Sequence, residues 1–170
     1  MNMLVSTAQD ELVAFLEEDA RQPLPPAGAA WKVLIVDDDP EVHQATVFAL
    51  KGQHVCGRPL DLFHAHSAEE AMAFLRRTAG VAVIFLDVVM ESHDAGLELV
   101  RRIRGELGLM ETRIILRTGQ PGYAPEMSVI RDYDINDYRT KSELTHTRLM
   151  TTLTSAIRAF EQITGLTEAR

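Results

Sequence analysis

The sequence predicts an α/β domain in which a parallel sheet is covered by helices on both faces. Five short apolar runs, rich in β-branched residues, alternate with segments of helical periodicity. Strands that alternate with helices in this way form parallel sheets with right-handed crossovers. The 170 residues, 46% of them hydrophobic, are enough for one well-buried domain with short appendages.

The first predicted strand is Val33–Val36, which is apolar throughout, as expected of a strand buried on both faces. Three aspartates follow it, and Pro40 then suits the first turn of a helix that runs to about Leu50. The same reasoning predicts four further strands, at 62–66, 81–86, 113–116 and 135–138.

The remaining helices are predicted from a start signal or from an apolar stripe. Ser67 and Glu70 have the spacing of a capping box, which opens a helix to about Arg77. Apolar residues at helical spacing predict helices near 97–104 and 126–131, and a last helix at about 144–163.

We expect the folded domain at residues 31–164, between a leader at 1–30 and a tail at 165–170. The leader is acidic, and its residues 4–19 form either a short docking helix or a loosely ordered segment. A proline-rich linker at 23–28 separates it from the domain.

Composition excludes several classes of function. Lys and Arg total 17 against 25 Asp and Glu, and the net charge of −8 disfavours binding to nucleic acid or to an anionic membrane. A single cysteine, Cys56, excludes an intramolecular disulfide framework and fits a reducing compartment. No signal peptide or membrane-spanning run is evident. We therefore expect a cytoplasmic protein.

The carboxyl ends of the predicted strands carry the polar residues that matter most, because in parallel sheets functional groups gather at this edge. These residues are Asp37, Asp38, Asp87, Thr118, Tyr138 and Lys141. Taken singly, each is also typical of a turn or a solvated helix cap. Their order, each behind an apolar strand, favours one shared site.

Such a site suits phosphoryl transfer. Clustered carboxylates repel one another unless a cation is bound, and hard oxygen ligands favour Mg²⁺. A central aspartate can act as a nucleophile and form an acyl phosphate. Transfer then depends on positioning and on neutralising the phosphoryl oxygens. Mg²⁺ would cover one oxygen, the Lys141 ammonium a second, and the Thr118 hydroxyl with a backbone N–H the third.

From about Trp31 to Phe160 the chain resembles the receiver domain of a two-component response regulator. The matching stretches read VLIVDDDP at 33–40, IFLDVVM at 84–90, GLELVRRIR at 96–104 and YRTK at 138–141. The resemblance implies a flavodoxin-like, doubly wound, five-stranded parallel sheet of order 2-1-3-4-5 with five helices. In sequence, the chain is similar to receivers at the N-terminus of larger bacterial signalling proteins. Some of these proteins carry cyclic-dinucleotide turnover modules.

The resemblance also implies a role for each residue of the site. Asp87 is the phosphoacceptor, assisted by Thr118 and Lys141, and Thr118 with Tyr138 forms the switch. The implied ligands of Mg²⁺ or Mn²⁺ are Asp37, Asp38, Asp87 and the backbone carbonyl of Val89. Such a domain is not an enzyme beyond catalysing its own phosphotransfer and dephosphorylation.

The implied partners are a cognate histidine kinase or phosphotransfer protein. Phosphorylation would remodel the surface formed by the fourth helix, fifth strand and fifth helix through an added charge of about −1.5 to −2. That surface would serve a homodimer or an output domain outside this chain.

Two loops depart from the family's pattern. Residues 91–94, Glu-Ser-His-Asp, replace the usual proline after Met90, and Gly96 lies one position late. Ser142 follows Lys141 where proline is usual, and a cis bond to a non-proline residue costs about 2.5–4 kcal/mol, so we expect a trans bond.

Two polar residues lie close to Thr118 in the sequence. Arg117 stands where an apolar residue is expected, so it either extends to a helix edge or pairs with Glu91 or Asp94. Gln120 could contact the hydrolytic water.

Other interpretations stay open. The altered loops suit a phosphorylation-independent interaction module, and an Mg²⁺-dependent phosphohydrolase is weaker because Val89 stands where such enzymes place a second aspartate. His64 and His66 share a strand face that could bind a metal, although a structural role is favoured.

Overall fold

The structure, a computed structural model, describes residues 28–119, 127–141 and 145–168. The predicted leader helix and nearly all of the proline-rich linker lie outside these ranges. Six strands form one sheet in the order β2-β3-β1-β4-β5-β6, and five helices pack on it. The strands are β1 (Trp31–Val36), β2 (His54–Val55), β3 (Arg58–Ala65), β4 (Val81–Asp87), β5 (Arg113–Thr118) and β6 (Asp137–Thr140). The helices are α2 (Pro40–Leu50), α3 (Ala68–Arg77), α4 (Ala95–Gly105), α5 (Met127–Asp132) and α6 (His146–Glu168).

The strand order confirms the flavodoxin-like arrangement and adds one short strand. β3, β1, β4, β5 and β6 pair in parallel, which gives the predicted order 2-1-3-4-5. β2 pairs with β3 antiparallel as a hairpin whose two-residue turn is Cys56 and Gly57. Both turn residues have positive φ, 49° and 77°, as a type I′ turn requires.

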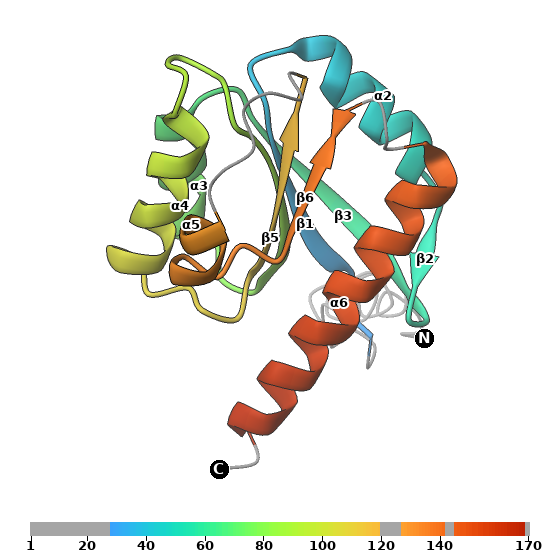
Figure 1. The fold of residues 1–170 in the computed structure, drawn as a ribbon. Helices are drawn as coiled ribbons and strands as arrows, with labels where there is room; N and C mark the ends of the chain where they lie inside the picture. Colours follow the sequence, from blue (N-terminus) through green and yellow to red (C-terminus); the bar gives the residue numbers. More distant parts are fainter. Residues whose placement is uncertain (1–27, 120–126, 142–144, 169–170) are drawn as a thin grey trace, which may run out of the picture.

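β4 lies at the centre of two apolar layers, and all seven of its residues are buried. Ile84 and Leu86 face the layer of α3 and α4, whereas Val83 and Phe85 face the layer of α2 and α6. Figure 1 shows the helices divided between the two faces in the same way. The alternation follows from the two-residue period of a strand.

The two predicted helix starts are confirmed in detail. The carboxylate of Asp39 accepts a hydrogen bond from the backbone N–H of Glu41 (2.9 Å), and Pro40 is the first helical residue of α2. Ser67 Oγ accepts from the N–H of Glu70 (3.1 Å) at the start of α3. The carboxylate of Glu70 in turn accepts from the N–H of His66 (2.8 Å). Each contact satisfies a backbone donor at a helix start.

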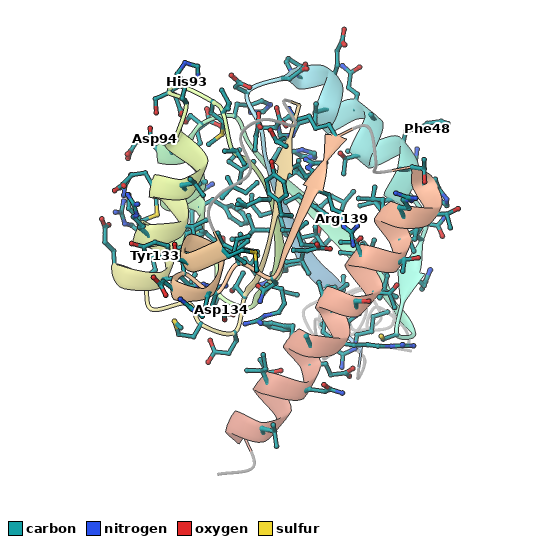
Figure 2. The ribbon with its side chains drawn as sticks, in the orientation of Figure 1. Phe48, His93, Asp94, Tyr133, Asp134 and Arg139 are labelled. Carbon is teal, nitrogen blue, oxygen red and sulfur yellow. The ribbon has the colours of Figure 1, made fainter. Side chains whose placement is uncertain are left out.

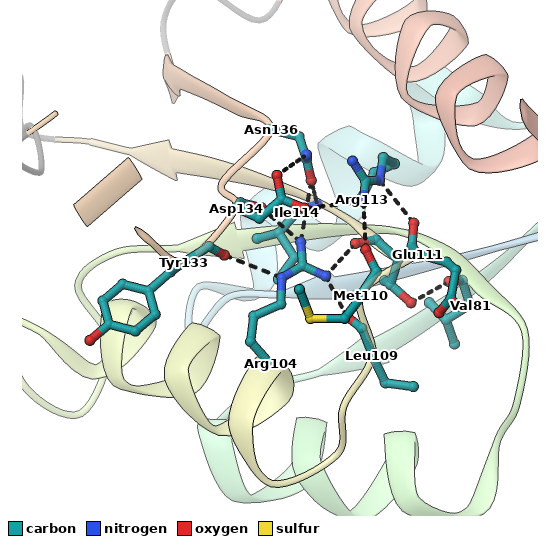
Figure 3. A network of polar contacts seen from close by, with 11 residues as sticks. Val81, Arg104, Leu109, Met110, Glu111, Arg113, Ile114, Tyr133, Asp134 and Asn136 are labelled. Atoms are coloured by element: carbon teal, nitrogen blue, oxygen red, sulfur yellow. Dashed lines mark hydrogen bonds and ion pairs between the residues drawn. The ribbon is translucent and has the colours of Figure 1, made fainter. Parts of the chain in front are cut away.

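At the amino end of β5, the buried guanidinium of Arg104 holds the α5–β6 turn in place (Figure 3). It donates to the backbone carbonyls of Thr112 (2.8 Å), Asp134 (2.8 Å), Tyr133 (3.2 Å) and Leu109. Burial lowers the pKa of Arg104 to about 10, which leaves it protonated at neutral pH. A buried charge is tolerated here because several carbonyls satisfy it.

The last helix is longer than predicted. α6 continues to Glu168, five residues past the predicted end, and its final turns extend beyond the amino edge of the sheet (Figure 1). Among the described residues, none of the helices is both long enough and apolar enough to cross a bilayer.

Candidate functional site

The carboxyl ends of β1 and β4 bring three carboxylates together. Asp37 follows β1 and is fully buried, Asp87 ends β4 and is 3% exposed, and Asp38 is exposed. One oxygen from each lies within 4.8 Å of the other two. The sheet thus assembles the acidic cluster that the sequence predicted.

Asp37 is held rigidly on both its side chain and its backbone. Its Oδ1 accepts from the backbone N–H of Asp39 (2.9 Å), and its carbonyl accepts from His43 Nε2 (2.7 Å). Since a carbonyl can only accept, His43 Nε2 carries a proton, and a neutral His43 must accept at Nδ1 from His64 Nδ1 (2.7 Å). His64 therefore orients the His43 ring through this hydrogen bond. The sequence did not predict a role for His43.

The Asp87 carboxylate lies between an N–H and an ammonium. Its Oδ1 accepts from the N–H of Val89 (3.4 Å), and its Oδ2 accepts from Lys141 Nζ (3.1 Å). Burial, followed by the charge of Asp37, raises the pKa of Asp87, and Lys141 opposes this shift. The Asp87 carboxyl group is thus costly to ionise in the absence of a cation.

Lys141 bridges the two buried carboxylates. Its Nζ lies 3.0 Å from Asp37 Oδ2 and 3.1 Å from Asp87 Oδ2. Burial lowers the pKa of Lys141, but its contacts with Asp37 and Asp87 outweigh burial, so the pKa is raised overall. Lys141 is therefore protonated at neutral pH, as a phosphate-binding amine requires.

The residues present fit a hard divalent cation. All donors of the cluster are carboxylate oxygens, which Mg²⁺ and Mn²⁺ prefer. Besides its ion pair with Lys141 Nζ (3.0 Å), the buried Asp37 Oδ2 has no hydrogen-bond partner among the described residues, so a lone pair remains available for a metal. Val89, half-buried two residues after Asp87, remains a predicted ligand through its carbonyl.

The two predicted switch residues lie on neighbouring strands. Thr118 is fully buried at the end of β5, and Tyr138 of β6 pairs in register with Leu116. By strand alternation, Thr118 and Tyr138 face the same side of the sheet. The Tyr138 hydroxyl is buried and has no hydrogen-bond partner among the described residues. Their switch roles remain predictions.

The unusual loop between β4 and α4 folds back on the site. The N–H of Gly96 donates to the carbonyl of Val88 (3.0 Å), and the Glu91 carboxylate accepts from the N–H of Ala68 at the start of α3 (2.8 Å). His93 and Asp94 lie at the outer end of this loop (Figure 2). The Glu91 carboxylate is thus engaged at the start of α3.

Both predictions for Arg117 are wrong. The side chain is 3% exposed, so it does not extend to solvent. Its Nε and Nη2 have no hydrogen-bond partner among the described residues, so it does not pair with Glu91 or Asp94. Arg117 Nη1 instead donates to Thr46 Oγ1 of α2 (3.1 Å), because β5 directs this side chain into the layer of α2 and α6. The predicted contact of Gln120 and the conformation of the Lys141–Ser142 bond lie outside the described residues.

Comparison with known families identifies the chain. A family model described as the response regulator receiver domain matches residues 33–154, inside the predicted domain of 31–164. The chain belongs to the response-regulator receiver domain family. The receiver fold and its place in two-component signalling, predicted from the sequence, are thereby confirmed.

A curated relative of this receiver is 3'3'-cGAMP-specific phosphodiesterase 2 of Vibrio cholerae serotype O1. The two are 47% identical over 133 residues, which is 78% of this chain and 26% of the relative. The receiver thus spans about a quarter of the relative's length.

Solved structures share the receiver fold at low sequence identity. The signal receiver domain of an HD domain-containing protein from Pseudomonas fluorescens Pf-5 is 22% identical with a TM-score of 0.64, covering 78% of this chain and 98% of that one. An adenylate cyclase structure from Rhodopirellula baltica is 18% identical with a TM-score of 0.70, covering 82% and 96%.

The close approach of α4 to the backbone of Asp87 leads to a first prediction. A Cβ at Gly96 would lie 2.2 Å from the backbone oxygen of Asp87, whereas one at Gly105, in the same helix, would meet nothing within 4 Å. Gly96→Ala is expected to lower the free energy of unfolding by about 3 kcal/mol or more. Gly105→Ala, the matched control, should leave it unchanged or raise it by up to about 1 kcal/mol. Urea denaturation measures both, and equal effects would show that the helix has room to shift.

The raised pKa of Asp87 leads to a second prediction. The folded state holds this proton more tightly than the unfolded state, so stability falls as pH rises through the raised pKa. In chelator at pH 7, Asp87→Asn should therefore raise the free energy of unfolding by on the order of 1 kcal/mol. The gain should disappear as the pH falls below the ordinary aspartate pKa.

Exposed Asp61 on β3 supplies the charge-matched control, since Asp61→Asn should show no such pH-dependent gain. An Asp87→Asn variant less stable than the wild type at pH 7 would contradict the assigned cost.

Proposed function

We propose that this receiver is a phosphorylation switch whose acceptor is Asp87. The observation that carries the proposal is the position of the Asp87 carboxylate, which joins the acidic cluster on one side and contacts Lys141 on the other. A nucleophilic oxygen, a candidate cation site and an ammonium thus lie within reach of one phosphoryl group. This combination suits phosphoryl transfer, which needs position and charge neutralisation above all.

In the proposed step, a carboxylate oxygen of Asp87 attacks the phosphorus of a phosphohistidine on a kinase or phosphotransfer protein. The P–O bond to Asp87 forms as the P–N bond breaks, and the donor imidazole keeps the electron pair and takes up a proton. Lys141 holds one phosphoryl oxygen. Mg²⁺, held by Asp37, Asp38, Asp87 and the Val89 carbonyl, would neutralise charge on another oxygen.

The signal would pass through the buried Thr118 hydroxyl and the half-buried Tyr138 ring. Thr118 lies at the end of β5 beside the acceptor edge, and Tyr138 lies on the adjoining edge strand. A new anion on Asp87 would draw the hydroxyl towards it, and Tyr138 would follow. The surface of α5, β6 and α6 would then present the phosphorylated state to a second copy or to an output region.

The third prediction concerns phosphorylation itself. With Mg²⁺ and acetyl phosphate, the intact mass of the chain should increase by one phosphoryl group. Asp87→Asn should abolish the increase, and Asp61→Asn should not affect it. Absence of an adduct on the wild type, under conditions that label a known receiver, would refute the acceptor role.

A phosphorylation-independent interaction module makes the opposite prediction for the surface. Its oligomeric state would be the same with and without beryllofluoride, a phosphoryl mimic. A change in mass by light scattering that Asp87→Asn abolishes would count against this rival.

We further infer an output. Because the curated relative is named as a 3'3'-cGAMP-specific phosphodiesterase, a cyclic-dinucleotide phosphodiesterase is the output that best suits this receiver. The inference rests on sequence identity across the receiver alone, which is 26% of the relative's length.

The fourth prediction tests that output. A protein that joins this receiver to such a phosphodiesterase region should hydrolyse 3'3'-cGAMP at rates that differ by about fivefold or more with and without beryllofluoride and Mg²⁺. Asp87→Asn should remove the difference. Equal rates in the wild type would refute this output while leaving phosphorylation of Asp87 untouched.

A further inference from the structure

Arg117 is a buried cation whose hydrogen bonding is incomplete. Its guanidinium donates to Thr46 Oγ1, but Nε and Nη2 are buried and have no acceptor among the described residues. Buried donors without partners cost stability, and most native structures contain few of them. Among the described residues, hydrogen bonding therefore does not account for the burial of this charge.

The position of Arg117 ties it to the acceptor. It pairs in register with Asp87, and its carbonyl accepts from the N–H of Val88 (3.1 Å). Paired residues of neighbouring strands face the same side, and the guanidinium lies over the ring of Phe85, 5.1 Å from its centroid. Phe85 precedes Asp87 by two residues and shares its face. The guanidinium therefore lies on the same face of the sheet as Asp87, where it interacts electrostatically with Asp37 and Asp87.

The surroundings of Arg117 let its charge act at a distance. A cavity of about 130 Å³ separates α2 from α6, and its walls include Arg117 and Lys141 together with apolar Val42, Ala45, Ala49 and Leu149. Apolar walls screen charge poorly, so interactions across them are stronger than in water. Burial lowers the pKa of Arg117 to about 10, against the opposing charges of Asp37 and Asp87. It remains charged at neutral pH.

We propose that Arg117 is a second fixed cation of the acceptor site, which weakens the binding of Mg²⁺ to the resting site and strengthens the retention of the phosphoryl group. Three carboxylates face two cations, Lys141 and Arg117, so the resting site carries one negative charge. Bound Mg²⁺ makes it positive by one charge. Without Arg117 the metal-loaded site would be neutral, and an arriving phosphoryl anion would meet no net attraction.

The fifth prediction uses a neutral and a charged replacement. Arg117→Met should bind Mg²⁺ about tenfold more tightly by calorimetry, because a repelling charge is removed. With saturating Mg²⁺, the same variant should bind beryllofluoride about tenfold more weakly, because an attracting charge is removed. Arg117→Lys, which keeps the charge, should move both affinities back towards the wild type.

Opposite signs distinguish a field effect from a structural one. If both affinities fall in Arg117→Met, the residue only supports the fold; if neither changes, its charge does not reach the site. Either result overturns the inference. The beryllofluoride arm rests on the proposed phosphorylation of Asp87. A wild type that takes up no beryllofluoride refutes that function, while the Mg²⁺ arm still decides the role of Arg117.

A measurement on the wild type covers the case in which Arg117→Met does not fold. The Nε–H resonance of Arg117 should shift in NMR spectra when Mg²⁺ and beryllofluoride are added. Buried Arg104, at the opposite edge of the sheet, serves as the control and should not shift. An Arg117 resonance as unresponsive as that of Arg104 overturns the inference.

Discussion

The burial of β4 on both faces is the constraint on which this site depends. A charge within the strand would have to be buried between two apolar layers, so the first acidic position is its last residue, Asp87. The parallel neighbours β1, β5 and β6 end at the same edge. Side chains separated by more than 50 residues, such as Asp87 and Lys141, therefore come into direct contact.

Carboxylates gathered at one edge of the sheet repel one another, and neighbouring side chains offset part of this repulsion. Asp37 and Asp87 are buried close together, and burial with mutual repulsion raises the pKa of Asp87. Lys141 offsets part of this repulsion by contacting both carboxylates. His43 fixes the backbone of Asp37 from the other side. A bound cation would reduce the repulsion among the carboxylates. Under the proposed function, a phosphoryl anion would then reduce the repulsion between that cation and Lys141.

The sequence predicted the features that depend on local pattern. Strands buried on both faces leave apolar runs, and Asp39 and Ser67 mark helix starts by their type and spacing. The acidic cluster followed from the rule on strand ends. The β2–β3 hairpin was not predicted from the sequence, because Cys56-Gly57 lacks the usual asparagine or aspartate before glycine. The contacts of Arg104 and Arg117 could not be predicted from the sequence either. Arg104 contacts Tyr133, 29 residues away, and Arg117 contacts Thr46, 71 residues away. The local sequence marks Arg117 as out of place in an apolar strand, but it does not show what either guanidinium contacts.

Conservation of Gly96 and conservation of Arg117 would have different causes in the evolution of this domain. The backbone of Asp87 leaves no room for any side chain at position 96. Lineages that keep the fold must therefore keep glycine there, even those that have lost signalling. Conservation of this glycine therefore gives no evidence about function. The backbone does not demand arginine at 117, and an aliphatic residue there would remove two buried donors, Nε and Nη2, that have no acceptor among the described residues. The persistence of Arg117 among descendants would be the mark of selection on the chemistry of Asp87.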